Sequence, residues 1–297
     1  MHPIYPLDLN FLNRKEAIAA YLIPYKGGAV LVETGSGSTV KELSQNLWKY
    51  GLKPQDVTHV LLTHLHLDHA GAAGWLAMQG AHIYVHPVGE QHMKDPEKLL
   101  SSAKRIYGDK MDFLWGEFLP VPVDKLSSVL DQEQIVAGDL VFTAIHTPGH
   151  AEHHISWLFE DTCFTGDVGG VRMPGVLYLR LPLVPPELDF DKWRQSLTRL
   201  SEIGFQNIAP THFGIYEDAQ AHLRLAKQIL DENELWMEST FTNEKPIELL
   251  RELYMAFLNE QGTKLGVGEE TLKTSEVANP SWMGADGLLR YWNKHRR

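Results

Sequence analysis

The hydrophobic residues in the first two thirds of the chain form short β-prone runs that alternate with helical patterns. Residues 17–24 and 29–33 are apolar runs on either side of Gly27 and Gly28, an arrangement that predicts a hairpin. Residues 39–50 begin with a capping box and carry leucines at helical spacing, so they predict a helix. The same patterns predict further strands at 57–63, 83–86, 136–145 (a pair), 155–159, 162–165 and 207–209, and further helices at 70–78 and 189–203. This alternation indicates an α/β class of fold.

The pattern changes after residue 216. Apolar residues recur at helical spacing across 223–237 and again across 247–257, with no β-prone run between them. We therefore expect an α/β domain over residues 1–216 and a helical C-terminal extension over residues 217–297 that packs on it. Residues 96–120 are rich in aromatic side chains and follow neither pattern clearly, so no regular element is predicted there.

Composition narrows the classes of partner. The 297 residues include 27 Lys and Arg against 38 Asp and Glu, a formal net charge of −11, which argues against nucleic acid as a partner. The first residues lack the pattern of a secretory leader, and no apolar run approaches the ~20 residues of a membrane span. We expect a cytoplasmic protein without membrane contact. Its single cysteine, Cys163, leaves no pair for a disulfide or a thiolate zinc site, so a metal must be held by histidines and carboxylates.

Seven of the fifteen histidines fall in three short segments. The densest is the run from Thr63 to His69, THLHLDH, which directly follows a predicted strand. In extended backbone His64 and His66 point to one side, while the leucines between and after them point to the core. Asp68 and His69 add a carboxylate and an imidazole beside them. Imidazoles and carboxylates in this density are typical of a metal site, whereas a single histidine here would more often be structural.

Three further candidates lie at the ends of other predicted strands. His150 ends the run TPGH, Asp167 ends FTGD, and His212 lies in PTHFG. Taken alone, Asp167 or His212 is more typical of a turn cap or a surface residue. Together with the first segment, they form a repeated arrangement of ligand-type side chains after strands.

The runs HLHLDH, TPGH, FTGD and PTHFG, in this order and spacing, resemble the metallo-β-lactamase superfamily, and within it the glyoxalase-II-like and lactonase-like hydrolases. The resemblance covers about residues 17–215. It implies a four-layer αβ/βα sandwich with the metal site at one edge between the sheets, to which this chain adds its C-terminal helical extension. It also implies two metal ions, the first on His64, His66 and His150, the second on Asp68, His69 and His212, with Asp167 bridging both.

The expected function follows from that resemblance. Two divalent ions, most simply Zn²⁺ with Mn²⁺ or Fe as alternatives, would hold a bridging hydroxide that cleaves an ester, thioester or lactone of a small molecule. Asp68 would orient the nucleophile and relay its proton. The alternative is a mononuclear iron enzyme of the sulfur dioxygenase type that oxidises a persulfide. β-Lactam hydrolysis is less favoured because those relatives lack the bridging aspartate, and a non-catalytic binding protein is less favoured because no ligand position is missing.

Several residues are weaker candidates for the surroundings of the metals. His154, Arg172, Tyr178 and Trp115 are candidates for contacts with the substrate, with His154 also a candidate partner of the ligands, while His153 is expected to be structural. Residues 100–120, with Phe113, Trp115 and Phe118, are expected to form a wall or lid over the metal edge, a homodimer contact, or plain core. Glu33 stands where the resemblance implies aspartate, and its longer carboxylate is expected to reach a histidine behind the ligands or a backbone amide.

Overall fold

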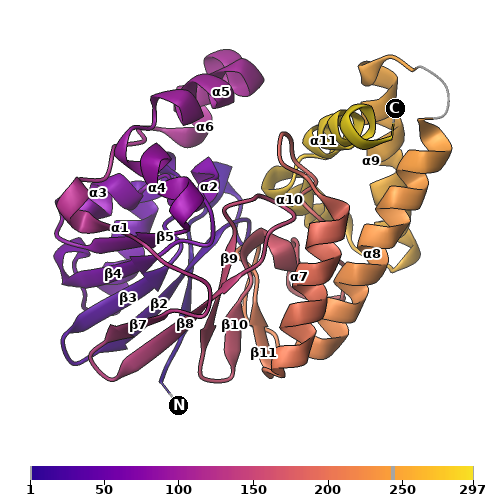
Figure 1. Cartoon of the computed structure of the whole chain (residues 1–297). Coiled ribbons are helices and arrows are strands. Elements are labelled where there is room, and N and C mark those ends of the chain that lie inside the picture. The colour runs from indigo at the N-terminus through magenta and orange to yellow at the C-terminus, as the bar shows by residue number, and fades with distance from the viewer. Residues whose placement is uncertain (1, 242–244, 297) are drawn as a thin grey trace.

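The centre of the molecule is a pair of β-sheets packed face to face, as seen in the computed structural model, which describes residues 2–241 and 245–296 (Figure 1). The first sheet has the order β1-β2-β3-β4-β5-β6. Its strands are Tyr5–Asp8, Ala19–Tyr25, Gly28–Val32, Val57–Leu61, His82–Val85 and Leu126–Ser128. The second sheet has the order β11-β10-β9-β8-β7. In chain order, from β7 to β11, its strands are Gln134–Ala137, Leu140–His146, Ile155–Phe159, Thr162–Phe164 and Asn207–Ala209.

Alternation along each strand explains how the sheets pack. In β2, Tyr21 and Ile23 face the second sheet, whereas Ala20 and Leu22 face the helices outside the first sheet. The two sheets are also linked by a hydrogen bond, because the Trp157 indole donates to the carbonyl of Leu62 (3.0 Å). The predicted hairpin is confirmed, with β2 antiparallel to β3.

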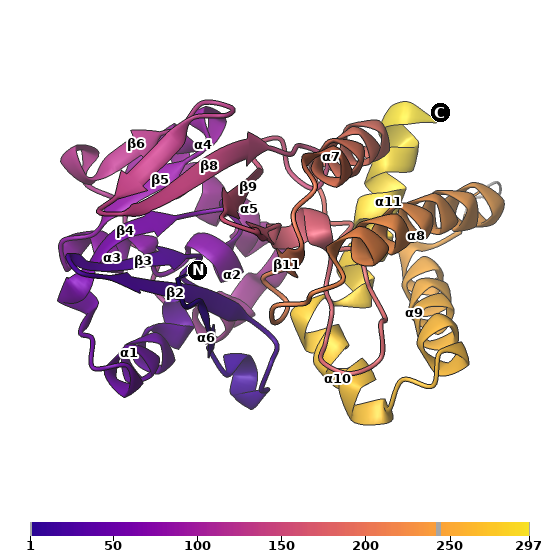
Figure 2. The ribbon, with the colours of Figure 1, turned by 90° about the horizontal axis from the view of Figure 1, so that it is seen from below.

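Helices cover both outer faces and complete the predicted four-layer sandwich (Figure 2). The helices on the side of the first sheet are α1 (Val40–Lys49), α2 (Leu67–Ala70), α3 (Ala73–Met78) and α4 (Pro87–Lys94). Outside the second sheet lie α7 (Phe190–Ile203) and α8 (Ala219–Thr240). The fold class predicted from the sequence is thus confirmed. No helix in the described ranges has the length and apolar character needed to cross a membrane.

The C-terminal helices share a core with the second sheet. They are α8, α9 (Ile247–Lys264), α10 (Glu269–Ala278) and α11 (Ser281–His295). Leu223, Leu250 and Leu288 from these helices belong to the same buried cluster as Ile208 and Cys163 of the sheet. α10 and α11 were not predicted, because their apolar positions are interrupted by polar residues and glycines. The division into domains at residue 216 stays a prediction.

Residues 96–120, for which no element was predicted, contain two helices. They are α5 (Glu97–Tyr107) and α6 (Met111–Trp115). Each ends at a glycine with positive φ, 54° at Gly108 and 62° at Gly116, and these stops break the helical pattern into short pieces. The Ser38 hydroxyl donates to the carbonyl of Leu114 (2.7 Å) and ties α6 to the loop after β3.

Candidate metal centre

The ligand-type residues meet at one edge of the sandwich because the strands before them end there. His64 and His66 follow β4, His150 follows β8, Asp167 lies in a short 3₁₀ turn after β10, and His212 follows β11. β8, β10 and β11 run in the same direction, since β9 is antiparallel to both β8 and β10 and β10 is parallel to β11. Their carboxyl ends therefore share an edge.

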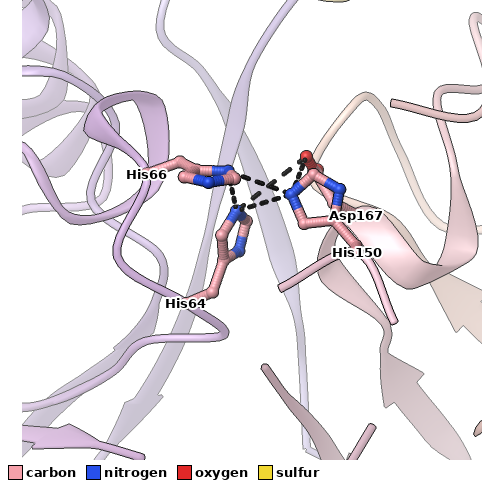
Figure 3. Close-up of side chains that lie close together, drawn as sticks. All are labelled: His64, His66, His150 and Asp167. Carbon is pink, nitrogen blue, oxygen red and sulfur yellow. Dashed lines mark hydrogen bonds and ion pairs between the residues drawn. The ribbon is translucent and has the colours of Figure 1, made fainter. Parts of the chain in front are cut away.

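The first group of ligand atoms is made by three histidines and one aspartate (Figure 3). Leu65 is buried in the core, and the histidines on either side of it face the site, as the alternation predicts. His64 Nε2 lies 2.8 Å from His66 Nδ1, and His150 Nε2 lies 3.2 and 2.9 Å from those two atoms. Asp167 Oδ2 lies 3.3 Å from His150 Nε2.

The second group consists of Asp68, His69 and His212. Asp68 Oδ2 lies 3.6 Å from His69 Nε2 and 3.5 Å from His212 Nε2. The other oxygen of Asp167, Oδ1, lies 3.3 and 3.4 Å from the same two nitrogens. The Asp167 carboxylate therefore stands between the groups and presents one oxygen to each.

Backbone acceptors fix which ring nitrogen of two histidines faces the site. His150 Nδ1 lies 2.7 Å from the carbonyl of Pro182, and His212 Nδ1 lies 2.7 Å from the carbonyl of Ala17. A carbonyl can only accept, so each Nδ1 carries a proton, and either ring in its neutral form presents an Nε2 lone pair to the site. Histidines that bind metals in proteins are held in this way.

The electrostatics of the two groups differ. Burial, together with the neighbouring histidines, holds the pKa of His64 well below its ordinary value. Burial also lowers the pKa of His66, so both rings are neutral at physiological pH. Burial opposes protonation of His212 too, but the carboxylates of Asp167 and Asp68, 3.4 and 3.5 Å from its Nε2, outweigh it and raise the pKa to about 9. The first group is thus a set of neutral donors, and the second is a place where carboxylates favour positive charge.

The donor set fits divalent metal ions. Two atoms bound at ~2.05 Å to a tetrahedral Zn²⁺ lie about 3.3 Å apart, near the 2.8–3.2 Å separations within the first group. His69 Nε2 and Asp167 Oδ1 are buried, and neither has a well-oriented hydrogen bond among the described residues. Buried polar atoms are rarely left unpaired, so an additional ligand at this point is expected.

A comparison with known protein families shows which family the chain belongs to. The profile of the Metallo-beta-lactamase superfamily matches residues 14–212, more than half of the chain. The chain belongs to the metallo-beta-lactamase superfamily. The two groups of ligand-type residues lie within the matched range, so they sit in the part of the chain that carries the superfamily fold.

Relatives and solved structures agree with that membership. A metallo-beta-lactamase fold-containing protein of Sulfurisphaera tokodaii is 31% identical over 183 residues, 60% of this chain and 68% of the relative. The N-acyl homoserine lactonase AttM of Agrobacterium fabrum is 30% identical over 116 residues, 36% of this chain and 38% of the relative. The structure of a metallo-beta-lactamase family protein from Thermus thermophilus has a TM-score of 0.72 at 20% identity and covers 99% of this chain and 94% of that chain. The last likeness shows the fold alone.

Glu33 stands where the resemblance implies aspartate, and its side chain contacts His69, a candidate ligand. Its Oε1 accepts from His69 Nδ1 (2.9 Å), from the Thr211 hydroxyl (3.0 Å) and from the Thr63 hydroxyl. The side chain is fully buried, and the backbone has φ of 68°, a left-handed conformation that costs free energy in a glutamate. Glu33 therefore fixes the tautomer of His69 from behind the site.

The surroundings of the metal site differ in part from the sequence prediction. His154, a candidate for substrate contact, is fully buried behind His64, with ring centroids 5.1 Å apart, and its Nδ1 is hydrogen-bonded to Thr147. This position is that of a residue packed behind the ligands. His153, expected to be structural, instead lines the cavity beside the metal site. Residues 152 and 153 form a turn before β9, so the side chains from His150 to His154 do not alternate as they would in a strand.

Arg172 and Tyr178 do not line the cavity, contrary to the prediction of substrate contact for both. Arg172 is buried and forms a bidentate ion pair with Asp218, at 2.5 and 2.9 Å. The Tyr178 hydroxyl donates to the carbonyl of Leu258 (3.0 Å) and accepts from Arg180 Nε (2.8 Å). Both side chains hold the C-terminal helices in place. This role could not be predicted, because the partners in those helices lie far away in the sequence.

The cavity over the metal edge has a volume of about 920 Å³ and is lined by α5, α6 and the segment that joins α10 to α11. Trp115, a candidate for contact with the substrate, lines it, whereas Phe118 is buried in the core of the first sheet and Phe113 is 72% exposed. Tyr107 and Met283 are lining residues that the sequence did not single out, and the Tyr107 hydroxyl meets Met283 Sδ at 3.2 Å.

Proposed function

We propose that this protein is a hydrolase that uses two adjacent divalent metal ions, Zn²⁺ as the first candidate, to cleave an ester, thioester or lactone of a small molecule. The observation that carries the proposal is the position of Asp167, whose two oxygens face different groups of histidines. A single ion would use only one of these groups. A carboxylate between two complete sets of ligands is the arrangement that a pair of ions requires.

The ions, when bound, supply a water that is acidic near neutral pH and polarise the oxygen on which negative charge develops. The residues that would hold them are His64, His66 and His150 for one ion, Asp68, His69 and His212 for the other, and Asp167 for both. Asp68 also lines the cavity, and its side chain is 18% exposed against 5% for Asp167. Asp68 is therefore placed to accept a proton from the attacking water and to orient it.

Similarity to known proteins supports an acyl substrate. The relative from Agrobacterium fabrum is, by its name, an N-acyl homoserine lactonase, and a lactone is one of the bonds proposed here. The oxidation of a persulfide at a single iron is not favoured, because both groups keep their ligand-type residues. The cavity adds an apolar enclosure next to the ligands, which suits the acyl part of such a substrate.

Elemental analysis and a substrate panel test the proposal. Protein purified without chelator is expected to hold about two ions per chain and to hydrolyse members of a panel of aryl esters, thioesters and lactones. His66→Ala is expected to lower the metal content and to abolish turnover, while His82→Ala, a histidine hydrogen-bonded to Ser127 on the sheet, serves as the matched control. One ion per chain, or turnover in His66→Ala above the metal-free background, would contradict the proposal.

A further inference from the structure

The wall of the cavity formed by α5 and the turn after it has charges that are sorted by sign. Three of the four cations between residues 97 and 112 line the cavity, and they are Lys98, Arg105 and Lys110. None of the acidic side chains of the same segment lines it: Glu97, Asp109 and Asp112. The whole chain has more acidic than basic residues, with a net charge of −11, so an average part of its surface would carry more acids than bases.

The cations lie along one stripe of α5 and its C-terminal turn. Lys98, Ser102 and Arg105 follow the spacing i, i+4, i+7, which places them on one face of a helix over about 10 Å. Tyr107, at the C-terminal end of α5, lines the same cavity as Asp68. Burial raises the pKa of Tyr107, and the charge of Asp68 adds to the increase, so this end of α5 lies near the metal site.

These three cations have no protein partner among the described residues, whereas most acids of the cavity are paired or belong to the candidate metal site. Neither Lys98, Arg105 nor Lys110 forms an ion pair or a side-chain hydrogen bond in the part of the chain that the structure describes. Glu276 on the opposite wall is paired with Arg180 (2.8 Å). Glu187 lies 3.8 Å from His153, whose ring is neutral because burial lowers its pKa to about 4. The remaining lining carboxylates belong to the metal site. The cavity thus offers three unpaired cations at its α5 rim, against Glu187 as the one lining carboxylate outside the candidate metal site that has no cationic partner among the described residues.

The wall between the rim and the metal site is apolar. Its larger side chains come from both sides of the cavity and include Leu99, Ile106, Leu114, Trp115, Val277 and Met283. Figure 1 shows α5 and α6 over the first sheet and α10 and α11 over the second, which are the two sides that contribute these residues. An apolar enclosure with a cationic rim matches a ligand that is apolar along its body and negatively charged at one end.

We infer that the substrate is an anionic amphiphile, with its scissile carbonyl at the metal site, its apolar body in the cavity, and a carboxylate or phosphate held by Lys98, Arg105 and Lys110. The position of the scissile bond rests on the proposed function, but the binding of the anion does not. The net charge of the protein repels anions at long range, so this local rim would be the feature that selects them.

A pair of fluorescent probes tests the binding without any turnover. 8-Anilino-1-naphthalenesulfonate and N-phenyl-1-naphthylamine share an aromatic body and differ by the sulfonate. We expect saturable one-to-one binding with about tenfold tighter affinity for the sulfonate. The triple variant Lys98→Ala, Arg105→Ala, Lys110→Ala should lose this preference, while Lys104→Ala, on the same helix but outside the cavity, should keep it. Equal affinity of the two probes, or a triple variant that keeps the preference, would overturn the inference.

Competition and kinetics then distinguish the source of the charge and the role of the site. Decanoate and decyl phosphate, displacing the sulfonate probe, show which anion the rim prefers. In the metal-loaded protein, kcat/KM for mono-4-nitrophenyl sebacate should exceed that for 4-nitrophenyl decanoate by about tenfold, and the triple variant should bring this ratio close to one. If neither ester is hydrolysed while the probe preference persists, the proposed function fails and the anion site stands. A ratio near one in the unmodified protein contradicts the inference.

Discussion

The edge of the sandwich and the walls of its cavity contribute to the same site in different ways. At the edge, four of the five candidate ligand histidines are buried. His150 is held from behind by the carbonyl of Pro182, and His212 by the carbonyl of Ala17. On the α5 wall, the Tyr107 hydroxyl is hydrogen-bonded to the thioether of Met283, and Lys98 is exposed. Reactive groups that need fixed geometry lie on the ends of strands, and groups that meet variable ligands lie on short helices.

Removal of Asp167 is the strongest test of the difference between the edge and the α5 wall. Asp167→Ala takes one oxygen from each group of histidines, so we expect both ions to bind weakly and kcat/KM to fall by about a thousandfold, or about 4 kcal/mol of barrier. Metal content and hydrolysis of the best ester of the panel measure the effect. Asp109→Ala, an exposed aspartate of the wall outside the cavity, is the matched control and should change neither. Similar losses in the two variants would remove the distinction between edge and wall.

His222 tests how the C-terminal helices support the edge. Its Nε2 lies 2.6 Å from the carbonyl of Gly169, in the turn that carries Asp167, and its Nδ1 accepts from Arg172. Burial lowers its pKa to about 4, below the ordinary 6.5, so the folded protein disfavours the protonated ring. The free energy of unfolding is therefore unaffected by this histidine above pH 6.5. It decreases by at most about 3 kcal/mol as the pH falls toward 4, because the unfolded chain binds the proton first.

The variant His222→Gln keeps a side-chain donor for Gly169 and cannot titrate. Its free energy of unfolding, measured by urea at pH 7.5 and pH 4.5, should therefore fall less with acid than that of the unmodified protein. The difference between the two proteins isolates this histidine from the others that titrate in the same range. Identical pH dependence in both would show that the contact with the turn does not depend on the charge of His222.

Glu33 gives a smaller effect at the edge, because it acts through His69. Glu33→Gln removes the negative charge that fixes His69 Nδ1, and we expect the affinity for the second ion to fall by 10–100-fold, or roughly 1–3 kcal/mol. Competition with a chromogenic chelator measures the affinity, and circular dichroism reports the fold. Glu33→Asp, which restores the usual residue of the superfamily, separates charge from length. Unchanged affinity in Glu33→Gln would mean that the tautomer of His69 is set elsewhere.

The elements at the edge could be predicted from the sequence because the patterns that indicate them are local. THLHLDH places four ligand-type side chains directly after a strand, and the strands before His150, Asp167 and His212 are themselves apolar runs. Each signal is contained in fewer than about ten residues, and the order of the segments matches a known family. The elements that position these residues were therefore within reach of the sequence, although their assignment as ligands stays a proposal.

The walls were not predictable because their contacts join distant segments. Tyr107 meets Met283 across 176 residues, and Arg172 pairs with Asp218 across 46. No spacing within either segment carries that information. The side on which His153 lies could not be predicted for another reason, because residues 152 and 153 form a turn to which strand alternation does not apply.

The smallest effect is expected for the hydroxyl of Tyr107, which tests how the α5 wall contributes to the site. The Tyr107 hydroxyl donates to Met283 Sδ, a weak acceptor, and its ring packs edge-on against Trp115 with centroids 5.1 Å apart. Tyr107→Phe keeps the ring and removes only the hydroxyl, so the free energy of unfolding should change by less than about 0.5 kcal/mol. If the wall acts by shape and rim charge, kcat/KM on the best substrate should change by less than about threefold. A fall of a hundredfold would instead mean that the phenol touches the reacting atoms, and the wall would then belong to the chemistry of the edge.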